Sequence, residues 1–152
     1  MKPVSFTYTG AISSPVQEVF ELITDVSRMP DWLPGCRAVA PGSGPVRKGT
    51  RHRVQFQRAG RRVDAEIEVI EYTPPTGYGW VETRGRQGAK AFFGLQFQGA
   101  TTRVAMKYVF TPVGWRAWLK AQVYRRRHAH EMFDRLLQDL RKALMHGKEA
   151  RR

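Results

Sequence analysis

The start of the chain combines a strand pattern with two helix patterns. Residues 4–9 alternate apolar and polar side chains, which is the period of a half-buried strand. The stretch from Ser14 to Gln17 reads Ser-Pro-Val-Gln, a capping box with proline at the first helical position. Apolar residues from Val16 to Ile23 follow at the spacing of one helical face. A second short helical segment is predicted around residues 27–33.

Two strand pairs in the middle of the chain can be aligned residue by residue. A turn at Ala59-Gly60 predicts a hairpin with one apolar face and with opposite charges facing each other on the other side. The inward pairs are Phe56 with Val63, Val54 with Ala65 and His52 with Ile67, and the outward pairs are Gln55 with Asp64, Arg53 with Glu66 and Arg51 with Glu68. We expect this register because a slip by one residue would turn every side chain to the opposite face.

A second hairpin is predicted around a turn at Gly99-Ala100. Its inward pairs are Leu95 with Val104, Phe93 with Met106, Ala91 with Tyr108 and Ala89 with Phe110, and its outward pairs are Gln96 with Arg103 and Lys90 with Val109. The segment between the two hairpins forms a further strand that contains Tyr78, Trp80 and Glu82. Its pattern leaves open which face of the sheet these three side chains occupy.

The hydrophobic period changes after residues 112–114. A helix is predicted from about Trp115 to about His146, with an apolar stripe formed by Leu119, Val123, Phe133, Leu137, Leu140 and Leu144. At 1.5 Å per residue this helix would be about 45 Å long and would cross the whole sheet. The consecutive strands indicate the α+β class: a seven-stranded curved antiparallel sheet wrapped around a long C-terminal helix, with two short helices after the first strand. We expect one domain over residues 1–147 and a frayed basic tail over residues 148–152.

Several short motifs stand in order along the chain. They are Ile12-Ser13-Ser14-Pro15, Asp25-Val26, the segment from Met29 to Gly35, Lys48-Gly49-Thr50-Arg51, the segment from Val69 to Pro75, and Thr102-Arg103-Val104. In this order and spacing they resemble the polyketide cyclase/dehydrase branch of the START-like, birch-pollen-allergen-like superfamily. The stretch from Asp31 to Cys36 is also similar to the ubiquinone-binding and ribosome-associated branch. The resemblance implies a helix-grip fold with an apolar cavity for a lipophilic ligand, and cyclisation is confined to some members.

The charge balance is strongly basic. Lys and Arg total 26 against 13 Asp and Glu, which gives a formal net charge of +13. Part of this charge lies on the solvent side of the predicted helix 115–146, which could bind RNA, the ribosome or an anionic membrane. We favour a solvated helix face, because no aromatic residue beyond Tyr124 is interleaved with the basic run.

The sequence predicts a cytoplasmic protein. Its N-terminal residues show no signal-peptide pattern, and no segment approaches the roughly 18 apolar residues of a transmembrane helix. Cys36 is the only cysteine, so no internal disulfide can form and a reducing compartment is expected.

The predicted cavity lies between the sheet and the C-terminal helix. We expect it to be lined by His52, Phe56, Ile67, Phe93, Leu95, Met106 and Tyr108 below, and by Trp118, Gln122, Arg126 and His130 above, with Trp32 near its mouth. His52 could fix a ligand hydroxyl or carbonyl, or it could be a core histidine bonded to the backbone. Arg126 could pair with an acidic ligand group or with Glu82, or it could extend to the edge of the helix. No residue is assigned a catalytic role, no pair of histidines has metal-ligand spacing, and no cofactor is predicted.

We expect the protein to bind a small lipophilic or aromatic molecule without catalysing a reaction. Two alternatives stay open at this point. The first is a polyketide aromatase or cyclase in which His52, Tyr108 and Arg126 polarise carbonyls and move protons. The second is a basic module that binds RNA or ribosomes. The sequence identifies neither the ligand nor the choice between enzyme and carrier.

Overall fold

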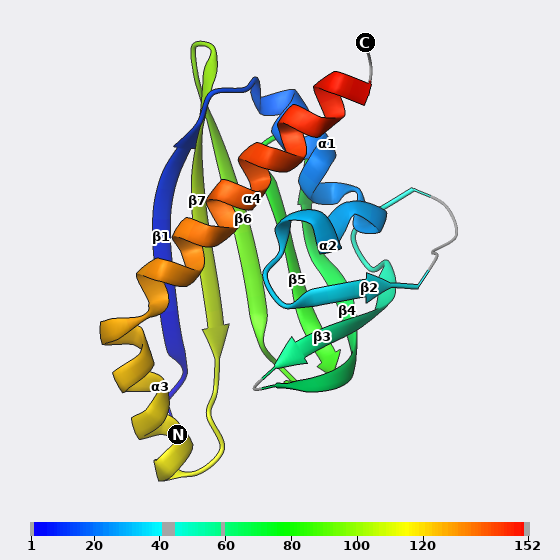
Figure 1. The fold of residues 1–152 in the computed structure, drawn as a ribbon. Coiled ribbons are helices and arrows are strands. Elements are labelled where there is room, and N and C mark those ends of the chain that lie inside the picture. The colour runs from blue at the N-terminus through cyan, green and yellow to red at the C-terminus, as the bar shows by residue number, and fades with distance from the viewer. Residues whose placement is uncertain (1, 41–44, 59, 151–152) are drawn as a thin grey trace.

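The described residues form seven antiparallel strands in one curved sheet (Figure 1). The computed structural model describes residues 2–40, 45–58 and 60–150, with side chains for all of these except Arg125, Arg126 and residues 148–150. The strands are β1 (Val4–Ile12), β2 (Cys36–Val39), β3 (Arg51–Arg58), β4 (Arg61–Thr73), β5 (Gly77–Arg84), β6 (Lys90–Gln98) and β7 (Thr101–Phe110). Their order across the sheet is β1-β7-β6-β5-β4-β3-β2, so the first two strands of the sequence lie at opposite edges.

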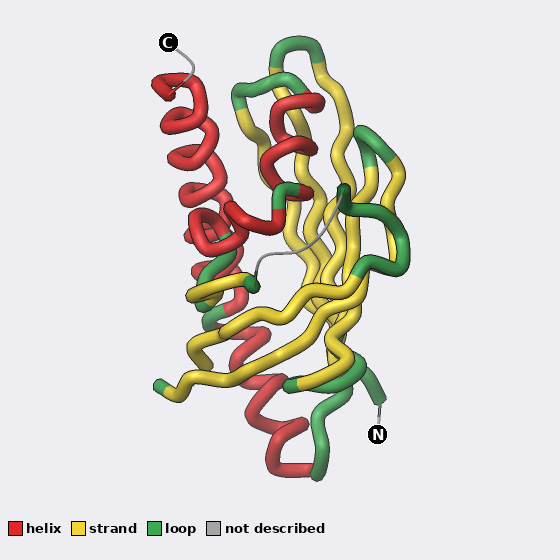
Figure 2. Tube along the Cα trace, turned by 90° about the vertical axis from the view of Figure 1, so that its right-hand side faces the viewer, coloured by secondary structure: helices red, strands yellow, loops and turns green. Residues whose placement is uncertain are grey.

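Helices cover one side of this sheet. The helices α1 (Val16–Thr24) and α2 (Met29–Trp32), joined by the 3₁₀ turn η1 (Val26–Arg28), follow β1, and α3 (Trp115–Arg127) and α4 (Ala129–Ala150) follow β7. Helix α4 runs across the sheet, and α2 contacts both α4 and β2 (Figures 1 and 2). The predicted α+β helix-grip fold is confirmed. We call the side of the sheet that faces α4 its inner face.

The predicted registers of both hairpins are confirmed. The inward pairs observed are Phe56 with Val63, Val54 with Ala65, His52 with Ile67, Leu95 with Val104, Phe93 with Met106 and Ala91 with Tyr108. The β6–β7 ladder begins at Lys90, so the predicted pair Ala89 and Phe110 falls just beyond it. Ala59, predicted in the first turn, lies outside the described residues. Its neighbour Gly60 has a φ of 76°, which glycine adopts without strain.

Strand β5 answers the question that its sequence left open. Tyr78, Trp80 and Glu82 alternate along the strand in register with buried residues of β4 and β6. All three side chains are buried on the inner face. On the outer face Gly79 leaves room for a neighbouring ring, because a Cβ there would lie 2.6 Å from Cδ1 of Phe92. The apolar side chain of Phe92 therefore packs over a glycine on the next strand.

The predicted single helix over residues 115–146 is wrong, because two helices occupy this segment. His128, with φ −127° and ψ −13°, separates α3 from α4. In the sequence the apolar stripe is interrupted at this point by Arg126 and His130. Leu119 and Val123 of the stripe are 52% and 48% exposed on α3. Only the α4 half of the predicted stripe is core.

Helix α4 packs closely on the inner face. Its buried residues are Ala129, Phe133, Leu136, Leu137, Leu140, Ala143 and Leu144. Gly10 on β1 permits the approach, because a Cβ there would lie 2.5 Å from Cδ2 of Leu137. Arg28 Nη2 donates to the Ala143 carbonyl at 2.9 Å and ties the α2 region to the helix. The helix continues through Gly147 to Ala150, so residues 148–150, predicted to be part of a frayed tail, belong to it.

Candidate ligand-binding interior

The inner face holds most of the side chains that we expected to line a cavity. Five of them are apolar, come from β3, β4, β6 and β7, and are at most 5% exposed: Phe56, Ile67, Phe93, Leu95 and Met106. Trp32 reaches the same interior from α2 and is fully buried. Its ring centroid lies 5.4 Å from that of Phe93. The wall between sheet and helices is thus largely apolar and aromatic.

Polar groups stand in this wall without hydrogen-bond partners. Both ring nitrogens of His52, the hydroxyl of Tyr78 and Nε1 of Trp32 are buried and unpaired within the described part of the chain. Of the two alternatives for His52, a core histidine bonded to the backbone does not match the described residues. Burial lowers the pKa of His52, which keeps the ring neutral at pH 7, and burial raises the pKa of the Tyr78 hydroxyl. Since most buried polar groups are hydrogen-bonded, these atoms mark interactions that the folded chain itself does not complete.

Two of the unpaired groups belong to one cluster of rings. The Phe93 centroid lies 5.4 Å from Trp32 and 5.6 Å from Trp80, and the Trp80 centroid lies 5.7 Å from Tyr78. Such tilted and edge-on contacts are favourable arrangements for aromatic side chains. The unpaired Nε1 and hydroxyl groups thus stand at the two ends of a continuous series of rings.

Glu82, in contrast, is buried and well paired. Arg58 Nη1 donates to Glu82 Oε2 at 3.0 Å, Arg58 Nη2 donates to Oε1, and the backbone N–H of Arg86 donates to Oε2 at 2.8 Å. Burial opposes the charge on Arg58, but its hydrogen bonds to Glu82 outweigh this and raise the pKa of the guanidinium. We considered Glu82 as a partner for Arg126, and the structure pairs the Glu82 carboxylate with Arg58.

Tyr108 lies half-buried between this interior and α3. Its ring centroid is 6.3 Å from that of Phe6, which in turn lies 6.1 Å from Tyr124 on α3. The Tyr108 hydroxyl accepts a hydrogen bond from Arg86 Nη1 at 3.1 Å. A run of aromatic contacts therefore leads from α3 to the inner face.

The residues predicted on the helix are distributed over α3 and α4. Trp118 on α3 is 37% exposed, and Gln122 is half-buried. The side chain of Arg126 lies outside the described residues. His130 is exposed at the start of α4, where its ring centroid lies 5.3 Å from that of Tyr8. Exposure distinguishes Trp118 and His130 from the buried residues of the inner face.

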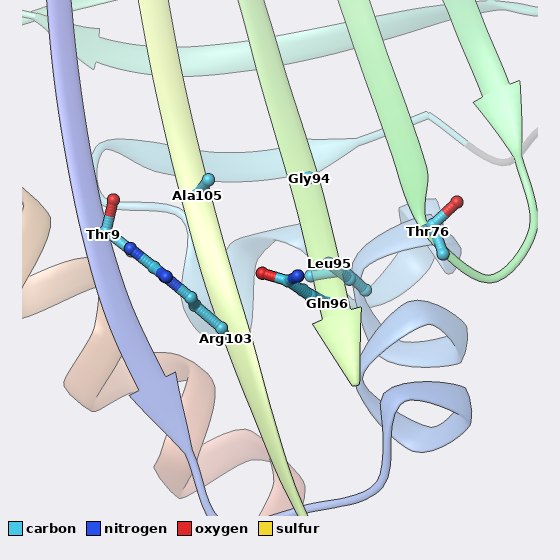
Figure 3. A pocket seen from close by; sticks show the side chains of 7 residues that line it. All are labelled: Thr9, Thr76, Gly94, Leu95, Gln96, Arg103 and Ala105. Atoms are coloured by element: carbon cyan, nitrogen blue, oxygen red, sulfur yellow. The ribbon is translucent and has the colours of Figure 1, made fainter. Parts of the chain in front are cut away.

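Two hollows lie away from this interior. The larger, of about 430 Å³, is on the outer face of the sheet (Figure 3), where it is lined by Thr9, Thr76, Gly94, Leu95, Gln96, Arg103 and Ala105. The smaller, of about 240 Å³, lies between α1 and the C-terminal part of α4. On the inner face the buried rings contact one another, so a ligand there would have to displace side chains.

Comparison with known proteins identifies the family. The sequence matches the family described as "Polyketide cyclase / dehydrase and lipid transport" over residues 3–145. The protein belongs to this family. The resemblance predicted from its motifs is thereby confirmed. No curated protein matches the sequence.

Solved structures share the fold of this family member at low sequence identity. The protein TTHA0849 from Thermus thermophilus superposes with a TM-score of 0.76 at 16% identity, covering 95% of this chain and 99% of that one. A START superfamily protein from Mycobacterium smegmatis gives 0.69 at 14% identity, with 93% and 97% covered. Ara h 8.0201 gives 0.67 at 10% identity, with 95% and 99% covered. These similarities establish a common fold.

The potential metal ligands among the described residues lie apart, and the single cysteine is buried. Within residues 2–40, 45–58 and 60–150, no three His, Cys, Asp or Glu side chains are grouped to hold a metal ion. Burial raises the pKa of the Cys36 thiol to about 12, so the thiol stays protonated at neutral pH. The helices in this part of the chain are too short or too polar to span a membrane.

Sequence reasoning did not include Arg58 and Tyr78 in the interior. A signal for Arg58 was present, because alternation from His52 along β3 puts it on the inner face. Tyr78 shares a face with Trp80 and Glu82, but that face depends on the pairing of β5 with both of its neighbours.

Proposed function

We propose that the protein binds a small, uncharged lipophilic molecule with at least one polar group, between the inner face and α4. The observation that carries this proposal is the set of buried, unpaired polar groups on His52, Tyr78 and Trp32. Leaving a buried donor or acceptor unsatisfied costs about 1–3 kcal/mol. A ligand that supplies the missing partners would recover this energy when it binds. Membership of a family described by polyketide chemistry and lipid transport supports the same conclusion.

The three groups differ in the hydrogen bonds that they can form with a ligand. The neutral ring of His52 donates from one nitrogen and accepts at the other, the Tyr78 hydroxyl does both, and the Trp32 indole only donates. A ligand with a hydroxyl or carbonyl oxygen matches all three. A charged ligand does not, because the buried carboxylate of Glu82 and the half-buried guanidinium of Arg58 already neutralise each other.

The expected affinity is modest. Burying about 300 Å² of apolar ligand surface is worth roughly 7 kcal/mol before the costs of association. Moving the contacting rings apart and immobilising the ligand reduce this value, so we expect micromolar dissociation constants.

Native mass spectrometry and thermal shift with a library of lipids and polyphenols test the proposal. We expect His52→Leu and Tyr78→Phe each to weaken binding of the hit compounds by about tenfold, as for the loss of one hydrogen bond to a buried group. Thr102→Val is the matched control, because the buried Thr102 hydroxyl already donates to the Ser14 carbonyl at 2.7 Å. Its affinity should equal that of the parent. Absence of any hit, or equal affinity of all three variants, would refute the proposal.

Catalysis is not part of the proposed function. Within the described chain the ring of His52 has no hydrogen-bonded acid or base beside it, and the Tyr108 hydroxyl is engaged by Arg86. We therefore expect no turnover of a poly-β-ketone surrogate by the parent protein. Turnover that falls on substitution of His52 would establish the cyclase alternative instead.

We propose that the protein is cytoplasmic. The buried, protonated thiol of Cys36 is suited neither to a disulfide nor to redox chemistry. Fractionation of cells that express the full chain measures this directly, and recovery in an exported fraction would contradict it.

A further inference from the structure

Helix α3 carries an apolar stripe that faces solvent. Trp115, Leu119 and Val123 follow one another at intervals of four residues, which puts them on one face of the helix. They are 65%, 52% and 48% exposed. The opposite side of the helix packs against the rest of the protein. Ala121 is buried there, and the Tyr124 ring contacts Phe6. We call the three exposed residues the apolar stripe of α3.

A basic stripe runs beside the apolar stripe. Arg116, Lys120 and Arg127 are exposed, and their spacing of four and seven residues keeps them on one side of the helix. Residues 83–130 contain ten Lys and Arg and no Asp or Glu, so no carboxylate in this stretch of sequence compensates the charge. Figures 1 and 2 show α3 at one end of the molecule, beyond the end of β7.

We propose that α3 docks the protein on an anionic phospholipid bilayer. An amphipathic helix with Trp and Leu on one side and Arg and Lys beside them lies in the plane of a membrane, with the apolar side in the acyl boundary. Tryptophan is favoured at that depth, and the basic groups meet the negative surface of the lipid head groups. The net charge of +13 attracts the whole protein to the same surface.

Two other occupants fit the stripe less well. A second copy of the chain packed on the apolar stripe would bring two basic stripes together, and like charges in contact oppose association. A nucleic acid would engage the arginines and a stacked tryptophan but would leave Leu119 and Val123 without a partner. Of these three occupants, the membrane alone satisfies the apolar and basic stripes at once.

Docking through α3 would also join the membrane to the interior of the protein. The contacts from Tyr124 to Phe6 and from Phe6 to Tyr108 form an aromatic path from the helix to the inner face. A lipophilic ligand that moves these rings apart would then exchange between bilayer and interior without crossing water. This last step rests on the proposed function, whereas membrane docking does not.

Sedimentation with vesicles tests the docking. The probes are vesicles of phosphatidylcholine alone, and of about one part phosphatidylserine to two parts phosphatidylcholine, at low and moderate salt. We expect the full-length protein to sediment with the anionic vesicles only, and less as salt rises. Tryptophan fluorescence shows which part of the protein contacts the vesicle, because Trp32 and Trp80 are buried while Trp115 and Trp118 are 65% and 37% exposed. A blue shift of emission should therefore come from α3.

Matched variants distinguish vesicle binding through α3 from vesicle binding through the net charge of the protein. We expect Leu119→Gln together with Val123→Gln to weaken vesicle binding by at least about tenfold. Phe97→Gln, at a more exposed apolar ring on β6, should leave it unchanged. Arg116→Gln with Lys120→Gln should weaken binding more than Arg61→Gln with Arg62→Gln at the exposed start of β4.

The opposing results are equally specific. Docking is wrong if anionic vesicles fail to bind the protein, or if the stripe and control variants lose binding equally. It is also wrong if the stripe variant abolishes self-association or RNA retention in place of vesicle binding. Ligand binding measured without vesicles on His52→Leu and Tyr78→Phe keeps a failure of the proposed function distinct from a failure of docking.

Discussion

The inner face of the sheet and helix α3 depart from the usual distribution of side chains in opposite directions. On the inner face, polar atoms of His52 and Tyr78 are buried among apolar groups and have no hydrogen-bond partner among the residues that the structure describes. On α3, Trp115 and Leu119 are mostly exposed to water. Each arrangement is unfavourable for the isolated chain, the first through lost hydration and the second through exposed apolar area. The inner face therefore lacks hydrogen-bond partners for its buried polar groups, and α3 lacks an apolar surface that would cover its exposed stripe.

The largest expected effect on stability concerns the ion pair between Arg58 and Glu82 on the inner face. Arg58→Met removes the partner of Glu82, which is only 2% exposed. An unpaired buried charge costs about 3–5 kcal/mol, so we expect the free energy of unfolding in urea to fall by that amount. Arg86→Met is the control, since its exposed guanidinium donates a hydrogen bond only to Tyr108 among the groups described, and we expect a loss of about 1 kcal/mol or less. Equal losses would show that Glu82 does not depend on Arg58.

The next prediction is an increase in the free energy of unfolding. His52→Leu removes an unpaired polar ring from the inner face, and we expect the free energy of unfolding at pH 7 to rise by about 1 kcal/mol. Burial lowers the pKa of His52 in the folded protein, below the value of about 6.5 in the unfolded chain. The unfolded state therefore binds more protons, and stability falls as the pH drops from about 6.5 through the lowered pKa.

The pH dependence of this effect gives a second measurement. The leucine variant lacks the titrating ring, so its stability advantage over the parent should widen between about pH 7 and pH 5. Urea unfolding of both proteins at the two pH values measures the difference. An advantage that is constant or that shrinks toward acid pH would mean that the ring is not buried as a neutral group.

Two tyrosines provide a smaller and more local test. The Tyr8 hydroxyl donates to Asp134 on α4, whereas the Tyr78 hydroxyl is unpaired. We expect Tyr8→Phe to lower the free energy of unfolding by about 0.5–1.5 kcal/mol, which is a few degrees in Tm for a chain of this size. Tyr78→Phe should leave the Tm unchanged or raise it. A larger loss for Tyr78→Phe would show that its hydroxyl has a partner in solution.

The smallest expected effect belongs to α3. Leu119→Gln and Val123→Gln replace half-exposed side chains, and each should change the free energy of unfolding by about 0.5 kcal/mol or less. Thermal unfolding in the absence of vesicles measures this. A loss above about 1.5 kcal/mol would show that the stripe packs inside the folded protein, and the contrast with the inner face would disappear.

The parts of the fold that sequence predicted are those with a local signature. The β3–β4 hairpin combines alternation with opposite charges across the strands, so the facing of His52 followed from its own two strands. The β5 strand has no hairpin turn of that kind, and the facing of Trp80 required both neighbouring strands. The break at His128 was missed because the spacing of apolar residues indicates a helical face but not whether another element packs against that face.

The candidate site divides in the same way. The sequence by itself determined the antiparallel registers and the apolar inward residues such as Phe93 and Met106, because side-chain direction alternates strictly along a strand. Only the tertiary structure decided that Arg58 pairs with Glu82, that Tyr78 and His52 stay unpaired, and that α3 shows its apolar stripe to solvent. These outcomes depend on distances between elements far apart in the chain, and pattern along a sequence does not contain those distances.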